Sequence, residues 1–150
     1  MPLDIQTLSD RLEINDLLIE YCDVIDKQDF DRFDRLFTAD ARIDYTAMGG
    51  IAGERDTVRE WLKKSLAIFP MTQHLIANSQ VKLNGDTATA RTMCHNPMNM
   101  PDGKGGHQVA FLGLWYVDKL VRTADGWRIS ERVEEFGYMS GMPEGFSPVK

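Results

Sequence analysis

Apolar residues recur at helical spacing in the first quarter of the chain, and the pattern predicts a long helix. The helix is expected over about residues 8–27, starting at a capping box of Thr7 and Asp10. Its apolar stripe comprises Leu8, Leu12, Leu18, Cys22 and Ile25, widened by Leu17 and Tyr21. A stripe of this kind indicates a helix with one face against a core.

Two shorter helices are predicted after it. The first follows Asp29, its expected N-cap, and the second begins near Asp56 and ends before Pro70. The residues expected to face inward are Phe30, Phe33, Leu36 and Phe37 in the first, and Val58, Trp61, Leu62, Ser65 and Leu66 in the second.

The rest of the chain alternates between apolar and polar residues, which predicts β-strands. The first strand is "ARIDY" (41–45), and the glycine-rich loop "MGGIAG" follows it. From residue 71 we expect a meander of four strands, with turns at Asn84-Gly85, "PDGKGG" and "TADG". The stretch "MTQHLIANS" (71–79), which contains His74, is expected to be one strand of this meander.

Helices followed by a meander predict an α+β fold, with three N-terminal helices gathered on one face of a curved sheet. The chain is expected to be a single domain over residues 1–150, with peripheral tails at about 1–6 and 140–150. A curved sheet that helices cover only in part leaves a conical pocket, which is the expected place for a ligand.

Charge and composition narrow the classes of function. The chain has 23 acidic and 17 basic residues and a net charge of −6, which argues against nucleic acid or an anionic membrane as a partner. The two cysteines, Cys22 and Cys94, show no metal-type spacing and are expected to be reduced, buried thiols in a cytoplasmic protein. We expect no metal, no organic cofactor and a small-molecule substrate.

Asp26 and His74 are the residues best suited to chemistry. Asp26 falls in the last turn of the long helix, where the helix dipole disfavours negative charge, so that it needs a partner. His74 is one of three histidines and stands in an otherwise apolar strand. Each residue also has a simpler interpretation, Asp26 as a helix cap and His74 as a core histidine. An Asp–His pair would fix the imidazole tautomer and make a general base.

The segment "YCDVIDKQDFDRFDRLFTADARIDY", followed by "TQHLIAN" and later by "GWRIS", resembles the SnoaL-like branch of the nuclear transport factor 2-like superfamily. It is especially similar to scytalone dehydratase and, less closely, to bile acid 7α-dehydratase and hexachlorocyclohexane dehydrochlorinase. The resemblance covers nearly the whole chain. It implies a cone-shaped α+β barrel with a mixed sheet (a cystatin-like fold), and assembly as homodimers or homotrimers.

The resemblance also implies site residues. Asp26 and His74 match the catalytic Asp–His dyad, and Tyr45 matches a tyrosine that helps to polarise the substrate carbonyl through a water. Tyr21 falls at an active-site tyrosine of the bile acid dehydratase. Arg132 matches an arginine that several of these enzymes point into the pocket.

Three positions depart from the pattern. Where scytalone dehydratase has a second histidine, the expected register places Met98, and His95 then faces the opposite side of the strand. Arg132 has the wrong parity to face inward with Trp127 and Ile129, unless a bulge lies between them. Without a bulge, Arg132 would pair outside the pocket with an acidic neighbour such as Glu134. Ile25 replaces a substrate-side tyrosine, so a different substrate is expected.

The predicted function is a cofactor-independent lyase of the dehydratase type, acting on a small hydroxylated apolar compound that is aromatic, polycyclic or steroid-like. His74 is the expected base, Asp26 its orienting partner, and Tyr45 and Tyr21 the donors to a developing enolate oxygen. The same residues would also serve a retro-aldol C–C lyase, an isomerase or a polyketide-type cyclase. A non-catalytic ligand-binding or structural subunit is the alternative from another class.

The later strands are apolar on both faces. Ala110, Leu112, Leu114 and Tyr116 alternate with Val109, Phe111, Trp115 and Val117. One face can pack against the helices, and the other would leave an apolar patch on a monomer. The pattern therefore predicts a homo-oligomer joined through the outer face of the sheet.

Overall fold

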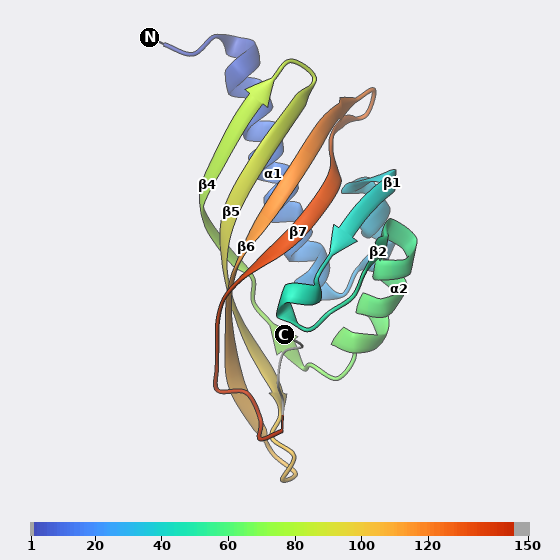
Figure 1. Ribbon diagram of the computed structural model, residues 1–150, viewed down its shortest axis with the longest axis vertical. Coiled ribbons are helices and arrows are strands. Elements are labelled where there is room, and N and C mark those ends of the chain that lie inside the picture. The colour runs from blue at the N-terminus through green and yellow to red at the C-terminus, as the bar shows by residue number, and fades with distance from the viewer. Residues whose placement is uncertain (1, 146–150) are drawn as a thin grey trace.

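The long helix α1 (Ile5–Lys27) lies diagonally across the upper part of the sheet (Figure 1) in the structure, a computed structural model that describes residues 2–145. Its N-cap is Asp4, whose carboxylate accepts hydrogen bonds from the backbone nitrogen and the hydroxyl of Thr7, both at 2.8 Å. The predicted capping box of Thr7 and Asp10 is therefore wrong, and the helix begins at Ile5.

Asp10 faces the sheet and determines how α1 is rotated. Its buried carboxylate accepts hydrogen bonds from Arg122, at 2.5 and 2.8 Å, and from the indole nitrogen of Trp127, at 3.1 Å. Leu8 and Leu12 are consequently turned to solvent, against the expected stripe. The apolar residues that α1 buries are Ile14, Leu17, Leu18, Tyr21, Cys22, Val24 and Ile25.

The second predicted helix is a short 3-10 helix, η1 (Phe30–Arg35), and the third is α2 (Arg55–Leu66). Asp29 precedes η1 but makes no side-chain capping hydrogen bond, because its carboxylate pairs with Arg32 at 3.2 Å. The predicted start and end of α2 are confirmed.

Seven strands form one mixed sheet in the order β2-β1-β7-β6-β5-β3, with β4 also paired to β5. Only the β1–β7 pair is parallel among the pairs of described strands. A short 3-10 turn, η2 (Thr46–Met48), connects β1 to β2. The strands are β1 (Phe37–Asp44), β2 (Ala52–Glu54), β3 (Met71–Thr72), β4 (Leu75–Asn84), β5 (Thr87–Pro101), β6 (His107–Thr123) and β7 (Gly126–Ser140).

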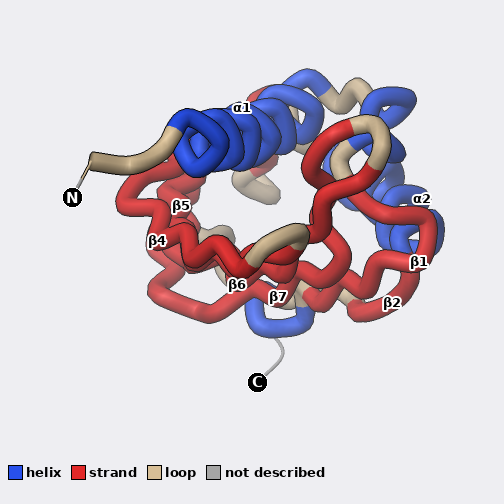
Figure 2. The backbone as a smooth tube through the Cα atoms, turned by 90° about the horizontal axis from the view of Figure 1, so that it is seen from above, coloured by secondary structure: helices blue, strands red, loops and turns tan. Residues whose placement is uncertain are grey.

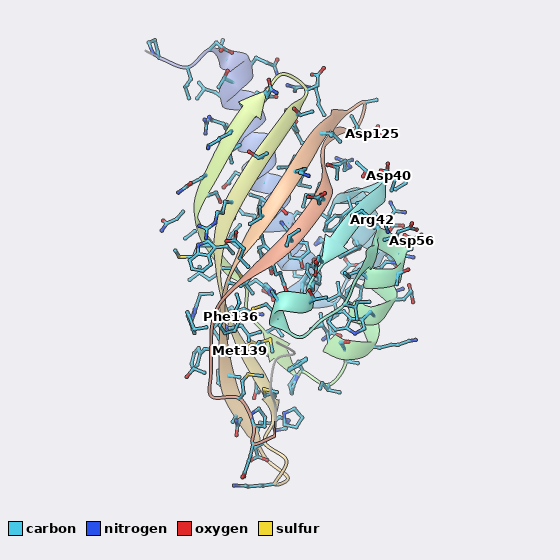
Figure 3. All side chains as sticks on the ribbon, in the orientation of Figure 1. Asp40, Arg42, Asp56, Asp125, Phe136 and Met139 are labelled. Atoms are coloured by element: carbon cyan, nitrogen blue, oxygen red, sulfur yellow. The ribbon has the colours of Figure 1, made fainter. Side chains whose placement is uncertain are left out.

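The sheet is strongly curved, and the long strands β5, β6 and β7 bend along their length (Figure 1; Figure 3 shows the same view with side chains). Seen from above, α1 lies across one face of the sheet and α2 lies beside β1 and β2 (Figure 2). The predicted α+β arrangement, three helices on a curved mixed sheet, is confirmed. Within residues 2–145, every helix is too short or too polar to cross a membrane.

The stretch "MTQHLIANS" is two strands rather than one. β3 ends at Thr72 and β4 begins at Leu75, so Gln73 and His74 lie in the break between them. The backbone nitrogen of His74 donates a hydrogen bond to the Asp26 carboxylate at 2.8 Å instead of joining the ladder. The strand is therefore interrupted at the residue of chemical interest.

A bulge in β7 resolves the parity of Arg132. Leu120 pairs with Ile129 and Lys119 pairs with Glu131, so Ser130 is the extra residue. Trp127, Ile129 and Arg132 are consequently all buried on the inner face. The bulge that the sequence requires is confirmed.

The outer face of β4, β5, β6 and β7 carries an exposed apolar patch, formed by Leu75, Met93, Val109, Phe111 and Tyr138. The inner-face residues of the same β6 alternation, Ala110, Leu112, Leu114 and Tyr116, are buried as predicted. We propose that the patch pairs with a second copy of the chain, because soluble monomers rarely expose adjoining apolar side chains of this size.

Phe111→Glu should convert the assembly to monomers, because a charge would be buried at the centre of the proposed interface. Light scattering coupled to size exclusion at micromolar concentration measures this. Leu12→Glu, at an exposed position on α1, is the matched control and should leave the assembly intact. A monomeric wild-type protein would contradict the prediction.

Candidate active site

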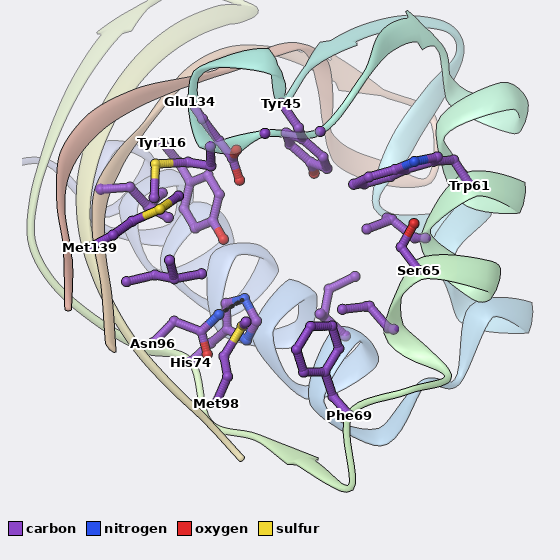
Figure 4. Close-up of a pocket in the computed structure, with 18 of the residues that line it drawn as sticks. Tyr45, Trp61, Ser65, Phe69, His74, Asn96, Met98, Tyr116, Glu134 and Met139 are labelled. Atoms are coloured by element: carbon purple, nitrogen blue, oxygen red, sulfur yellow. Dashed lines mark hydrogen bonds between the residues drawn. The ribbon is translucent and has the colours of Figure 1, made fainter. Parts of the chain in front are cut away.

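A cavity of about 380 Å³ lies between α1, α2 and the inner face of the sheet (Figure 4). Cavities of about 300–1,000 Å³ are typical of small-molecule sites. Met142 also lines this cavity, so part of the tail predicted to be peripheral (140–150) contributes to the cavity wall. Residues 146–150 of that tail lie outside the described residues. The apolar wall includes Ile25, Trp61, Leu62, Met98, Leu114 and Met139, and the polar groups are Tyr21, Tyr45, Ser65, His74, Asn96, Tyr116 and Glu134.

Asp26 and His74 are hydrogen-bonded at the cavity wall. Asp26 Oδ1 lies 2.6 Å from His74 Nδ1, and Asp26 Oδ2 accepts the backbone N–H of His74 at 2.8 Å. The hydroxyl of Thr72 donates to Asp26 Oδ1 at 2.8 Å. The His74 side chain is 6% exposed. The end of α1 and the break between β3 and β4 therefore hold the imidazole in one orientation.

The Asp26 carboxylate is stabilised in its charged form. Burial acts to raise its pKa, but hydrogen bonds and charge from His74, together with the Thr72 hydroxyl, outweigh burial and hold the pKa below its usual value. Asp26 is thus an anion at neutral pH, placed to accept a hydrogen bond from a protonated ring nitrogen of His74.

Asn96, on β5, contacts the other ring nitrogen. Its amide nitrogen lies 3.3 Å from His74 Nε2. An amide N–H donates only to an unprotonated ring nitrogen, and a carboxylate accepts only from a protonated one. The two contacts together favour the neutral tautomer with its proton on Nδ1. The basic lone pair is then on Nε2, where it accepts a long hydrogen bond of 3.3 Å from the Asn96 amide.

Tyr21 and Tyr45 form a hydroxyl pair on another part of the wall. Their phenolic oxygens are 2.7 Å apart, and both residues are buried. Burial raises the pKa of both phenols well above the usual value. One of the two hydroxyls donates its proton to the other oxygen, so the second hydroxyl proton is available to a ligand. The Tyr21 ring also meets the His74 ring edge-on, with centroids 6.4 Å apart.

Arg132 lies behind the cavity wall rather than in it. Its guanidinium makes two hydrogen bonds to Asp118, at 2.7 and 2.8 Å, and both side chains are fully buried. The guanidinium carbon lies 4.1 Å from the ring centroids of both Tyr21 and Tyr116. The expected alternatives were the pocket or a pair with Glu134. The partner is Asp118, and Arg132 supports the tyrosine rings from behind.

His95 and Met98 take the positions that the register predicts. Met98 lines the cavity, whereas His95 is on the outer face, where its Nδ1 lies 2.5 Å from the Tyr138 hydroxyl. The His95 ring also stacks on Phe111, with centroids 5.7 Å apart. His95 is therefore remote from the cavity and provides a natural control for His74.

The sequence did not indicate Asn96 and Glu134 as cavity residues, and it indicated Tyr116 only as a member of one face of its strand. Strand alternation could have indicated Asn96, since it has the parity of Met98. Glu134 could have been found from Arg132, because residues two apart on a strand share a face. Once the bulge turns Arg132 inward, Glu134 turns inward as well.

Glu134 has an unusual protonation state. Burial raises the pKa of its carboxyl to about 8, although the positive charge of Arg132 opposes the shift. Among the described residues, hydrogen bonds contribute nothing to this pKa. Glu134 is therefore mostly a neutral carboxylic acid at pH 7.

Among residues 2–145, no three His, Cys, Asp or Glu side chains are grouped so that they could hold a metal ion. The polar groups of the cavity wall are one imidazole, one amide, hydroxyls and one carboxyl. This set is suited to moving protons and binding oxygen atoms.

The fold and the cavity define a cone-shaped α+β protein that encloses a small apolar pocket with an Asp–His pair in its wall. The chain belongs to the SnoaL-like domain family, whose model matches residues 6–133. It is 48% identical over 132 residues to the Mycobacterium tuberculosis H37Rv protein Rv2910c, covering 88% of each chain.

Solved structures share the fold. The Kfla4162 protein from Kribbella flavida has a TM-score of 0.82 and 27% identity, with 90% of this chain and 95% of that chain covered. A scytalone dehydratase candidate from Novosphingobium aromaticivorans DSM 12444 has a TM-score of 0.80 and 17% identity, with 94% and 97% covered. The dehydrochlorinase LinA-type3 from Novosphingobium barchaimii LL02 has a TM-score of 0.78 and 18% identity, with 98% and 100% covered.

The hydrogen bonds around His74 predict its tautomer. In nitrogen-15 NMR spectra of the neutral ring, Nδ1 should carry the proton and Nε2 should show the shift of an unprotonated nitrogen. Asp26→Leu should release this preference, because the ring loses the acceptor that fixes it. A ring protonated on Nε2 in the wild-type protein would contradict the geometry.

The raised pKa of Glu134 predicts how stability depends on pH. The carboxyl of the unfolded chain has its usual pKa of 4.5, whereas burial raises the pKa of the folded one to about 8. Over that interval the folded state binds more protons, so its stability should fall as pH rises from about 4.5 through about 8. Glu134→Gln cannot titrate and should be the more stable protein at pH 9, with a smaller difference at pH 5. Urea unfolding of both proteins measures this, and parallel pH profiles would contradict it.

Proposed function

We propose that this protein is a cofactor-independent lyase that eliminates water from a small, largely apolar, hydroxylated substrate. The observation that carries the proposal is the 2.6 Å hydrogen bond between Asp26 and His74 in the wall of an apolar cavity. Similarity to a scytalone dehydratase candidate and to a dehydrochlorinase supports an elimination. The cavity size fits an aromatic or polycyclic compound.

His74 is the general base in this proposal. The substrate displaces the Asn96 contact at the unprotonated Nε2. Nε2 then removes a proton from a carbon that an adjacent carbonyl or aromatic ring makes acidic. Asp26 holds Nδ1–H and stabilises the positive imidazolium that forms. A pair that serves ligand binding alone has little reason to place a charged carboxylate against a buried imidazole, since burial of charge is costly.

The electrons of the broken C–H bond move onto the carbonyl oxygen and form an enolate. The free hydroxyl proton of the Tyr21–Tyr45 pair is available to that oxygen, as in an oxyanion hole. Arg132 lies behind the Tyr21 ring and adds a fixed positive charge that favours an anion in the cavity.

Elimination completes the reaction. The enolate re-forms the carbonyl, a carbon–carbon double bond forms, and the bond from carbon to the departing hydroxyl breaks. Protonated His74 gives its proton to that hydroxyl, so water leaves and the base is regenerated. Protons and electrons therefore balance without a cofactor.

A screen of hydroxylated aromatic and steroid-like ketones by mass spectrometry tests the reaction class. Loss of water supports the dehydratase, whereas loss of formaldehyde would indicate a retro-aldol cleavage by the same base. Conversion at unchanged mass would indicate an isomerase.

On a substrate found in this way, His74→Ala should remove nearly all turnover, by about 10²–10⁴-fold for loss of a general base. Asp26→Asn should lose a large part of the rate, because it no longer stabilises the imidazolium. The double variant should be hardly worse than His74→Ala, since residues that act as one unit are non-additive. Steady-state kinetics of the three variants measure this.

His95→Ala is the matched control, because His95 is also a histidine of the sheet but lies on β5 and faces away from the cavity. It should retain wild-type turnover, and unfolding curves of all variants must show a folded protein. A folded His74→Ala protein with wild-type turnover would mean that His74 is only a structural residue.

A further inference from the structure

Glu134 places an acid in the cavity that the proposed elimination does not use. Its side chain projects from β7 next to Tyr45 and Tyr116, on the side of the cavity opposite His74 (Figure 4). The nearby wall is apolar, with Leu112, Leu114 and Met139 among its members. A carboxyl group without a hydrogen-bond partner in an apolar wall lowers the stability of the fold relative to an apolar residue of similar size, which suggests that it serves a function.

The groups that face Glu134 come from several elements. Tyr21 on α1, Tyr45 after β1 and Tyr116 on β6 are phenols whose pKa burial raises far above neutrality, so they stay protonated. Arg132 on β7 is a permanent cation paired with Asp118, and Asp44 at the end of β1 is an anion whose charge acts on Glu134. His74 on the opposite side is the other ionisable side chain of the cavity wall.

A neutral carboxylic acid has one O–H donor, and the described residues around Glu134 leave that donor without an acceptor. A ligand in the cavity can supply that acceptor. A carbonyl oxygen fits this geometry, because it accepts a hydrogen bond and introduces no charge into an apolar space. His74 on the opposite side then faces the carbon skeleton of the same ligand.

We infer that Glu134 is the hydrogen-bond donor that recognises a carbonyl oxygen, and that the pocket binds uncharged apolar ketones. The inference rests on the proposed function for its catalytic meaning: the same hydrogen bond strengthens as the oxygen becomes an enolate. Recognition itself is a binding property and does not depend on turnover. Ionised Glu134 has no proton to donate and repels the lone pairs of the ketone, so recognition ends when Glu134 loses its proton.

The test is the affinity of 2-acetylnaphthalene, an aryl ketone that does not titrate, measured by fluorescence at pH 6.5 and pH 9.5. Wild-type protein should bind it about tenfold more weakly at the higher pH, which is the loss of one hydrogen bond of about 1.4 kcal/mol. Glu134→Gln should bind equally at both pH values, because its amide still donates. Glu134→Leu should bind weakly and equally at both.

His74→Ala separates this inference from the proposed function. It should keep the pH dependence of binding while it loses turnover, so each claim can fail alone. Wild-type affinity that is the same at both pH values, Glu134→Leu affinity equal to that of the wild type at pH 6.5, or no saturable binding would each overturn the inference. A pH dependence that disappears in His74→Ala would assign the effect to His74 and would overturn it as well.

Discussion

The structure around the cavity depends on how the charge of Asp26 is satisfied at the end of α1. The helix dipole and burial both oppose a carboxylate there. Three hydrogen bonds compensate: from the Thr72 hydroxyl, from the His74 backbone and from the His74 ring. Because the backbone N–H of His74 is used in this way, the strand is broken between β3 and β4. One carboxylate therefore ties the helix to the sheet and also sets the direction of the imidazole.

A second buried charge supports the opposite wall. Arg132 is held by Asp118 on one strand and lies between the rings of Tyr21 and Tyr116. Burying an ion pair is costly unless its geometry is good, and two short hydrogen bonds with two aromatic faces meet that condition. The bulge at Ser130 makes the arrangement possible, because it turns both Arg132 and Glu134 inward. The cavity thus has a base on one side and hydrogen-bond donors on the other.

Much of this arrangement could be predicted from sequence, and the exceptions have physical reasons. Strand alternation placed Met98 inside and His95 outside, and the parity conflict at Arg132 indicated the bulge. Predictions from helix propensity and from the spacing of apolar residues failed where a contact between residues distant in sequence determines the local structure. Asp10 rotates α1 through Arg122 and Trp127, residues more than a hundred positions away, and Leu8 and Leu12 are exposed as a result. The Asp26–His74 contact is predicted by the family resemblance alone, because nothing in the spacing of the two residues requires them to meet.

Exchange of carbon-bound hydrogen with solvent tests the central claim most directly, that the Asp26–His74 pair removes a proton from carbon next to a carbonyl. A ketone shown by titration to bind the cavity is incubated with the protein in deuterium oxide, and proton NMR follows loss of the hydrogens beside the carbonyl. Wild-type protein and His95→Ala should accelerate the exchange, whereas folded His74→Ala should return it to the rate in buffer. A bound ketone that exchanges equally fast with wild-type protein and His74→Ala would contradict the claim.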